Sequence, residues 1–108
     1  MEQAPQLSLL YTTFSTEEDA VRITRELLEK RLVACVNLLG TIKSLHFWEG
    51  RCEESREVAA LLKTTEKKVP EVIQTLQDLH PYDTPAILEI PVGQGAELFS
   101  KWVQESVR

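Results

Sequence analysis

Two histidines and two cysteines are the side chains of this sequence best suited to binding a metal ion. They are His46, His80, Cys35 and Cys52, and no two of them stand in H-x-x-x-H or C-x-x-C spacing. Structural zinc sites usually take their four ligands from such closely spaced pairs. The spacing therefore predicts no closed zinc site within a single chain.

The two histidines are interpreted differently. His80 closes a predicted helix, where the helix dipole favours an imidazolium, and a Pro-Tyr-Asp turn follows it. It is either a helix-terminal residue or a single imidazole given to a metal site shared between subunits. His46 alternates with Leu45 and Phe47 on a predicted strand and is interpreted as a pairing or interface side chain.

The sequence does not assemble a catalytic centre. No serine is placed beside a histidine and an acid, and there is no G-x-S-x-G motif. The turn at 14–18 has no glycine, and its acids occupy the helix start where a phosphate would bind. The chain is therefore not expected to be an enzyme, and no catalytic residue is assigned.

Aromatic side chains are few, so their positions matter. Phe47 and Trp48 stand near the end of a long predicted strand and fit a core, an interface or a ligand shelf. Tyr82 either packs locally or lines a cleft.

Composition sets the broad class. A chain of 108 residues is expected to form one domain over 1–108, and two cysteines without C-x-x-C suit a reducing compartment. The net charge is −5 and the basic residues are scattered, which argues against nucleic acid. No apolar run approaches the roughly 18 residues of a membrane helix, and residues 1–6 show no secretory pattern. A cytoplasmic location is expected, with no membrane partner.

Hydrophobic periodicity predicts the elements that hold these residues. Strands are predicted at 7–13, 33–48, 57–65 and 86–91. The predicted helices are one capped by Ser15 and running to about Arg31, one at 69–79, and a last one through Leu98 and Trp102. This order predicts an α+β, ferredoxin-like β-α-β-β-α-β sandwich with a C-terminal helix and both earlier helices on one face.

The second predicted strand is too long for a compact monomer. At roughly 3.3 Å per residue the segment 33–48 would span about 50 Å, whereas a domain of this size has a radius of gyration of about 13 Å. Gly40 predicts a bend or bulge within it. The hairpin must bend or pair with another chain, which places Phe47 and Trp48 at an expected interface.

Taken together, a series of short segments resembles the CutA divalent-cation tolerance family over about residues 7–107. The segments are Tyr11-Thr12-Thr13, Arg31 to Asn37, Trp48-Glu49-Gly50, Glu57-Val58, Leu62-Lys63-Thr64, His80 to Pro85, Pro91 and Trp102. The resemblance implies a homotrimer in which long hairpins complete sheets across subunits. It also implies a cytosolic role linked to copper and other divalent cations.

The copper ligands that the resemblance implies are only partly present. Those proposed for enterobacterial members are a Cys, the His of the His-Pro-Tyr turn, and a Glu after it. Tyr11 and Ala86 stand at the Cys and Glu positions, so His80 alone is retained as the predicted metal ligand. His46 and Cys52 replace a usual Tyr and a usual aliphatic residue, and they either form a new soft site at the hairpin turn or reflect drift.

Two functions of different classes follow. The first is a trimeric divalent-cation tolerance protein that binds copper or another divalent cation and responds to metal ions, with no further cofactor. The alternative is a trimeric small-molecule-binding signal protein. It resembles the nitrogen-regulatory signal proteins, which share this fold and bind ligands in clefts between subunits. By this resemblance Tyr82, Trp48 and Lys63 could line such a cleft, with Lys63 meeting an anionic ligand. A scaffold without a ligand is the third possibility, and titration with metals and nucleotides would separate the first two.

Overall fold

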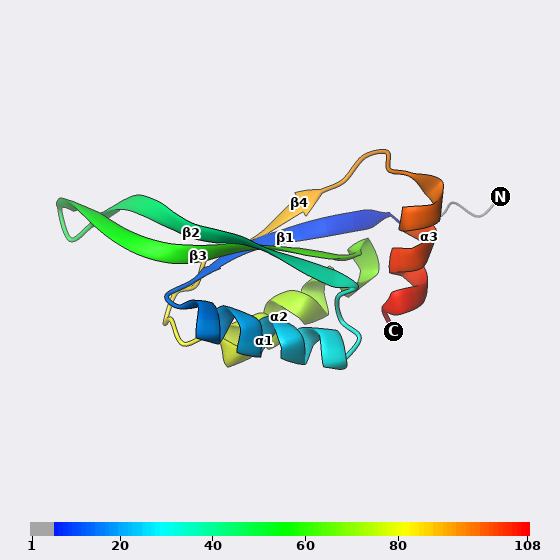
Figure 1. The fold of residues 1–108 in the computed structure, drawn as a ribbon. Helices are drawn as coiled ribbons and strands as arrows, with labels where there is room; N and C mark the ends of the chain where they lie inside the picture. The colour runs from blue at the N-terminus through cyan, green and yellow to red at the C-terminus, as the bar shows by residue number, and fades with distance from the viewer. Residues whose placement is uncertain (1–5) are drawn as a thin grey trace.

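Strands and helices follow one another in the order that the sequence predicts. The computed structural model describes residues 6–108, and the first five residues of the segment searched for a secretory pattern lie outside the described part. No helix within residues 6–108 has the length and apolar character needed to cross a membrane. The elements are β1 (Leu7–Phe14), α1 (Glu17–Glu29), β2 (Cys35–Trp48), β3 (Arg51–Thr65), the one-turn helix η1 (Glu66–Lys68), α2 (Val69–Leu79), β4 (Ile87–Pro91) and α3 (Glu97–Ser106) (Figure 1).

The four strands form one antiparallel sheet in the order β2-β3-β1-β4. Helices α1 and α2 cover one face of this sheet, and α3 lies at the end of the sheet near the start of β1 (Figure 1). The predicted α+β arrangement of a four-stranded sheet with helices on one face is therefore confirmed. The homotrimer stays a prediction, which a single chain does not test.

The capping of α1 differs slightly from the sequence expectation. Thr16, not Ser15, is the N-cap, and its hydroxyl accepts a hydrogen bond from the Asp19 N–H at 3.1 Å. The helix ends at Glu29, two residues earlier than predicted, because the chain turns at Arg31 with a φ of 59°. That left-handed conformation cannot continue a right-handed helix.

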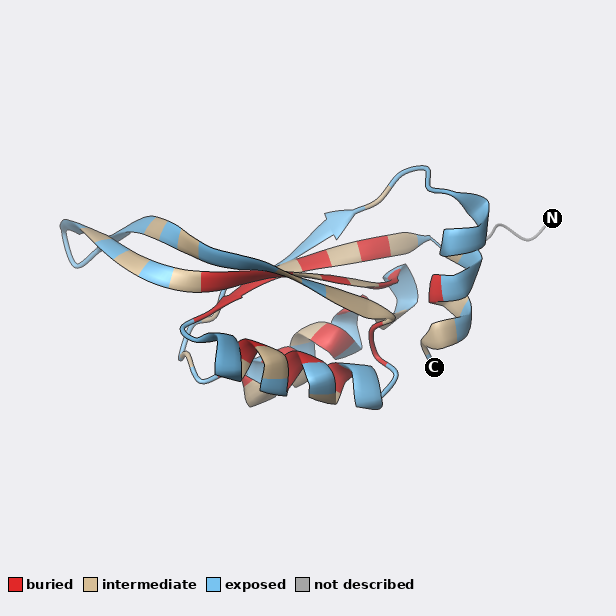
Figure 2. Cartoon of the chain, in the orientation of Figure 1, coloured by how far each residue is buried: buried red, intermediate tan, exposed pale blue. Residues whose placement is uncertain are grey.

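The core lies between the sheet and the two covering helices. Alternate residues of β1 and β3 point towards α1 and α2, as the two-residue period of a strand requires. Burial is concentrated on these facing surfaces (Figure 2). The buried apolar cluster comprises Leu10, Phe14, Ala20, Ile23, Leu27, Leu32, Val33, Val58, Ala60, Leu62, Val69, Val72 and Leu76.

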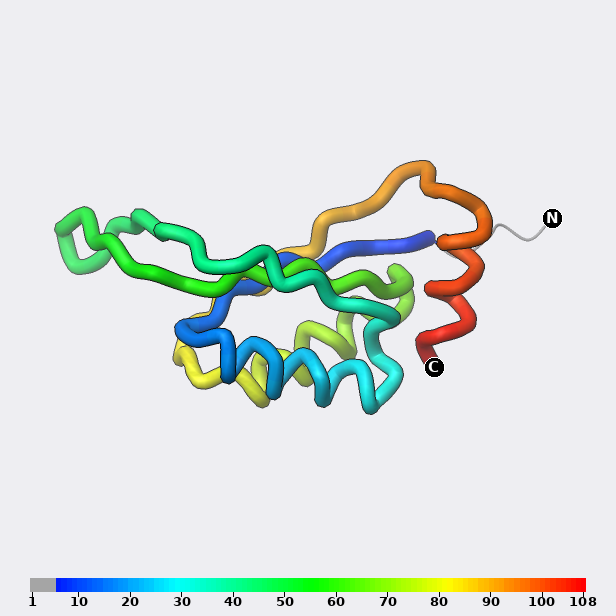
Figure 3. Tube along the Cα trace, viewed as in Figure 1, coloured from blue at the N-terminus to red at the C-terminus, as the bar shows by residue number. Residues whose placement is uncertain are grey.

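The β2–β3 hairpin extends well beyond the part of the sheet that the helices cover (Figure 3). It gives the molecule extents of 53 × 25 × 22 Å and a radius of gyration of 14.9 Å. A register shift between Leu38 and Gly40 confirms the predicted bulge, and Gly40 has a φ of 93°. Strand β3 begins at Arg51 and not at residue 57, because the polar segment 51–56 pairs along its full length with β2.

The face of the sheet opposite the helices carries a group of apolar side chains on β1, β3 and β4. Residues directly opposed in adjacent strands point to the same side, and Tyr11 is opposed to both Leu61 and Leu88, while Leu9 is opposed to Ile90. Leu88 is 62% exposed. We call these five residues the open face.

Candidate functional site

A cavity of about 520 Å³ lies where the base of the β2–β3 hairpin meets the turn after α2. Its volume falls in the range of small-molecule sites. Hydroxyl groups dominate its lining, with one carboxylate, one imidazole and one indole among them. The residues that line this cavity are Thr13, Ser44, His46, Trp48, Ser55, Glu57, Tyr82, Thr84 and Ala86.

Strand alternation explains why the hairpin residues gather there. Ser44, His46 and Trp48 are each two residues apart on β2 and therefore point to one side of the hairpin. Ser55 is directly opposed to Ser44, and Glu57 follows two residues later on the same side of β3. The cavity is thus formed by paired strands and bordered by a turn, and it does not depend on a free loop.

His80 fixes the turn that closes the cavity. The imidazole is 7% exposed and stacks on Phe14, with ring centroids 4.8 Å apart and planes 8° from parallel. Its Nδ1 accepts a hydrogen bond from the Tyr82 N–H at 3.1 Å, and its Nε2 lies 2.8 Å from the Thr13 carbonyl oxygen. A carbonyl only accepts, so Nε2 carries the proton and donates, and the ring is the neutral Nε2–H tautomer.

These hydrogen bonds set a condition on the predicted metal ligation by His80. Both ring nitrogens already have partners, so a metal could take a lone pair only if the Tyr82 N–H moved away from Nδ1. Residues 6–108 contain no group of three or more His, Cys, Asp or Glu side chains placed to hold a metal ion. The metal role of His80 therefore stays a prediction, and it depends on opening the turn or on groups from another subunit.

Glu57 carries the negative charge of the cavity. The Tyr82 hydroxyl donates a 2.9 Å hydrogen bond to its Oε2. Partial burial acts to raise the pKa of the Glu57 carboxyl, but hydrogen bonds from Ser44, Thr13 and Tyr82, with the nearby charge of His46, outweigh it. The net pKa of Glu57 lies below the usual 4.5, so the group is ionised at neutral pH.

Tyr82 is expected to ionise late in an alkaline titration. Burial of the phenol, and then its hydrogen bond to the Glu57 carboxylate, raise the pKa of Tyr82 from 10.0 to about 12. Because the folded-state pKa is raised, this interaction stabilises the fold fully below pH 10.0 and is lost as the pH rises towards about 12. Ultraviolet absorbance should show a phenolate step in the range of the raised pKa, and Tyr82→Phe should remove it. Persistence of that step in Tyr82→Phe would refute its assignment to Tyr82.

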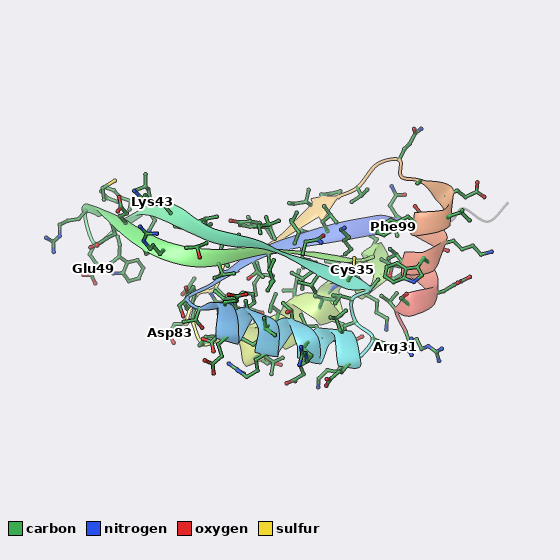
Figure 4. All side chains as sticks on the ribbon, in the orientation of Figure 1. Arg31, Cys35, Lys43, Glu49, Asp83 and Phe99 are labelled. Carbon is green, nitrogen blue, oxygen red and sulfur yellow. The ribbon has the colours of Figure 1, made fainter. Side chains whose placement is uncertain are left out.

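The structure brings together only part of the predicted ligand cleft. Tyr82 and Trp48 both line the cavity. Lys63 lies at the other end of the sheet, where its ammonium is 5.4 Å from the centre of the Phe99 ring and its strand position is opposite Cys35. Figure 4 shows Phe99 and Cys35 together at the α3 end, far from Glu49 at the hairpin tip. Within one chain Lys63 therefore does not meet the other two, and its role between subunits stays a prediction.

The hairpin tip separates the two residues of the suggested soft site. His46 is opposed to Glu53, whereas Cys52 is opposed to Phe47. Adjacent residues of a strand point to opposite sides, so His46 and Cys52 lie on opposite sides of the hairpin and form no joint site within one chain. Phe47 is 74% exposed and Trp48 is 60% exposed, which leaves their interface role open.

Comparison with known families gives the architecture a context. A family model described as CutA1 divalent ion tolerance protein matches residues 8–106, nearly the whole chain. The chain belongs to this family. Membership confirms the resemblance drawn from the sequence motifs. The CutA1 family is described by ion tolerance and not by a catalysed reaction, in agreement with the expectation that the chain is not an enzyme.

Relatives of the CutA1 family match over nearly their whole length. The divalent-cation tolerance protein CutA of Thermotoga maritima is 46% identical over 92% of this chain and 97% of its own. The crystal structure of CutA1 from Ehrlichia chaffeensis superimposes with a TM-score of 0.92 at 41% identity, covering 96% of this chain and 97% of that one. A relative from Archaeoglobus fulgidus, 40% identical over 94% of this chain and 99% of its own with a TM-score of 0.91, is described as periplasmic.

Sequence reasoning missed Glu57 as the charged centre of this CutA1-family cavity. It appeared only as part of the Glu57-Val58 motif, inside a segment whose strand start was placed at that residue. The available signal was the run of polar residues at alternate positions, Ser44, His46, Ser55 and Glu57. Such alternation on two paired strands predicts one polar side, but only the register shows that the two polar sides coincide.

Proposed function

We propose that this CutA1-family chain works as a cytoplasmic homotrimer in the response to divalent cations. The open face is the observation that supports the assembly. Its five apolar side chains form one surface on the sheet, and apolar surfaces of this kind usually mark protein interfaces. Phe47 on the protruding hairpin, 74% exposed, adds a further apolar side chain available for assembly.

Two other features fit the proposal. Cys35 is half-buried and Cys52 is exposed, and both are free thiols, which suits a reducing cytoplasm. The hairpin leaves unpaired backbone groups on the outer edge of β2, because β2 is the last strand of the sheet. Such an edge is a template for a strand from another chain, and inter-subunit sheets of this kind are what the family resemblance led us to expect.

Substitution of Leu88 by glutamate should dissociate the assembly. Light scattering of the parent protein at micromolar concentration should give about three times the 12.3 kDa of one chain. Leu88→Glu places a charge on the open face, where desolvating it on assembly would cost several kcal/mol. The variant should therefore scatter as a monomer.

Leu98→Glu is the matched control for this experiment. Leu98 is 83% exposed but lies on α3, and it is not one of the strand residues that form the open face. The same change of residue type there should leave the trimer intact. A monomeric parent protein, or a Leu88→Glu variant that remains a trimer, would refute the assembly through this face.

Copper is the divalent cation to test first, and we expect its binding to be weak. His80 can contribute one imidazole once the Tyr82 N–H leaves Nδ1, and one neutral imidazole with water holds a metal loosely. Calorimetric titration with copper(II) should show binding that is lost in His80→Ala and kept in His46→Ala, and that falls as imidazoles become protonated.

Two outcomes of this titration would refute copper binding at His80. Loss of binding in His46→Ala alone would move the site to the hairpin. Equal binding in all three proteins would mean that neither histidine holds copper. Circular dichroism of His80→Ala must accompany the titration, because the substitution also removes contacts that hold the turn.

The cavity favours a second candidate function, that of a small-molecule-binding signal protein. Its volume and its position on rigid strands suit an organic ligand better than a bare ion. The test is whether a ligand bound there changes the affinity for a divalent cation. Independence of the two binding events would reject a signalling role for the cavity.

A further inference from the structure

We propose that the cavity at the hairpin base binds a small organic cation, namely a primary ammonium group carried on an apolar body. Glu57 supplies the charge for this recognition and Trp48 supplies the apolar surface. The proposed ligand is positively charged, whereas the sequence led us to expect an anionic ligand that binds Lys63. The inference goes beyond the proposed function, because it requires neither metal binding nor the trimer.

Glu57 gives the cavity its negative charge. Among the described residues that line it, Glu57 alone bears a carboxylate, no Lys or Arg is present, and His46 is the one side chain able to carry an opposing charge. None of the ion pairs within residues 6–108 includes Glu57. An ionised carboxylate in a partly enclosed site attracts a cation, because the surrounding protein screens the charge less than water does.

The hydrogen bonds to Glu57 leave room for a ligand. A carboxylate offers about four acceptor positions, and hydroxyls of Tyr82, Ser44 and Thr13 occupy part of this capacity. Neutral hydroxyls orient the carboxylate without cancelling its charge. An ammonium group can therefore take a remaining acceptor position and form a charge-assisted hydrogen bond.

Trp48 determines what the rest of the ligand should be. The indole lines the cavity and is 60% exposed, on the same side of the hairpin as Ser44 and His46. An exposed indole face attracts cations and packs against methylene groups or rings. A ligand with an ammonium at one end and an apolar body at the other matches the two sides of the cavity.

A metal ion and an anion both fit less well. Divalent ions take at least four donors, and the described residues offer no group of three His, Cys, Asp or Glu side chains. An anion would face the carboxylate of Glu57 with no Lys or Arg, and only the imidazole of His46, to offset the repulsion. A cavity of about 520 Å³ is also far larger than one ion requires.

Phenethylamine and hydrocinnamate are matched probes for this inference, because they share a phenyl body and differ in the sign of charge. The experiment uses the full chain carrying Trp102→Phe, so that Trp48 is the remaining tryptophan and reports by fluorescence. Phenethylamine should change the emission saturably and hydrocinnamate should not. Glu57→Gln should weaken phenethylamine binding by at least about tenfold.

Glu53→Gln is the control for net charge. Glu53 lies on the same strand and the same side as Glu57, but it does not line the cavity. The Glu53→Gln variant should bind phenethylamine with the same affinity as the parent protein. Equal binding of the two probes, no binding of phenethylamine, or unchanged binding in Glu57→Gln would overturn the proposal.

Two further measurements keep the outcome clear. If circular dichroism shows that Glu57→Gln is unfolded, the comparison of the two probes on the parent chain decides alone. Light scattering and copper titration of the same preparation report on the trimer and the metal separately. Copper binding that is lost in Glu57→Gln, without any binding of phenethylamine, would assign the cavity to a metal instead.

Discussion

Replacement of Phe14 by alanine is expected to lower the free energy of unfolding by about 3–5 kcal/mol. The ring is fully buried in the main apolar cluster and is the surface on which His80 stacks. Its removal leaves a cavity at the end of β1 and takes away the support of the imidazole. Denaturant unfolding at one fixed protein concentration is the measurement, because the stability of an oligomer depends on concentration.

Phe14→Leu separates burial from ring stacking. Leucine retains most of the apolar volume but offers no ring to His80, so its cost should be about 1–2 kcal/mol. The order of stability is then parent, leucine variant, alanine variant. A Phe14→Ala protein within about 1 kcal/mol of the parent would contradict the packing of this residue.

His80→Ala is expected to lower the free energy of unfolding by about 2–4 kcal/mol, from two lost hydrogen bonds and a lost ring stack. The substitution leaves the Thr13 carbonyl and the Tyr82 N–H without their partner. It should also loosen the turn that carries the Tyr82 phenol, so the late phenolate step should move back towards the usual range. Thermal unfolding and ultraviolet titration measure the two effects.

His80→Phe is the matched variant. A phenyl ring can keep the stack on Phe14, but it has no nitrogen to bond with Thr13 or Tyr82. It should therefore recover only part of the stability lost in His80→Ala. Full recovery would show that the two hydrogen bonds contribute nothing, and that the turn is held by packing alone.

The helices and most strand boundaries could be predicted from local sequence. Helix α2 occupies residues 69–79 as expected, because Pro70 suits its first turn and the apolar stripe has a clear helical period. The start of β3 could not be predicted from local sequence, because the segment Arg51–Arg56 is polar and charged and has little intrinsic preference for a strand. It is extended because β2 pairs with it, which is a tertiary cause.

The site was predictable only in part. Trp48 and Tyr82 line one cavity in the structure, and their role in binding a ligand stays a prediction. Lys63 was grouped with them through family resemblance, although the strand register places it far along the sheet. The contacts of His80 join residues 67 positions apart, and no local pattern reports such a bond.

The bulge in β2 has a consequence for how length changes in the hairpin should be tolerated. Leu38 is opposed to Ala60 and Gly40 to Ala59, so Leu39 is a surplus residue with no partner of its own. Losing it would restore an even ladder and leave Ser44, His46 and Trp48 opposite their present partners. A deletion of one residue at the bulge should therefore be tolerated, because the pairing of β2 with β3 beyond the bulge keeps its register. A deletion near the tip, for example of Phe47, has no surplus residue beside it, and it would turn Trp48 to the opposite side of the hairpin.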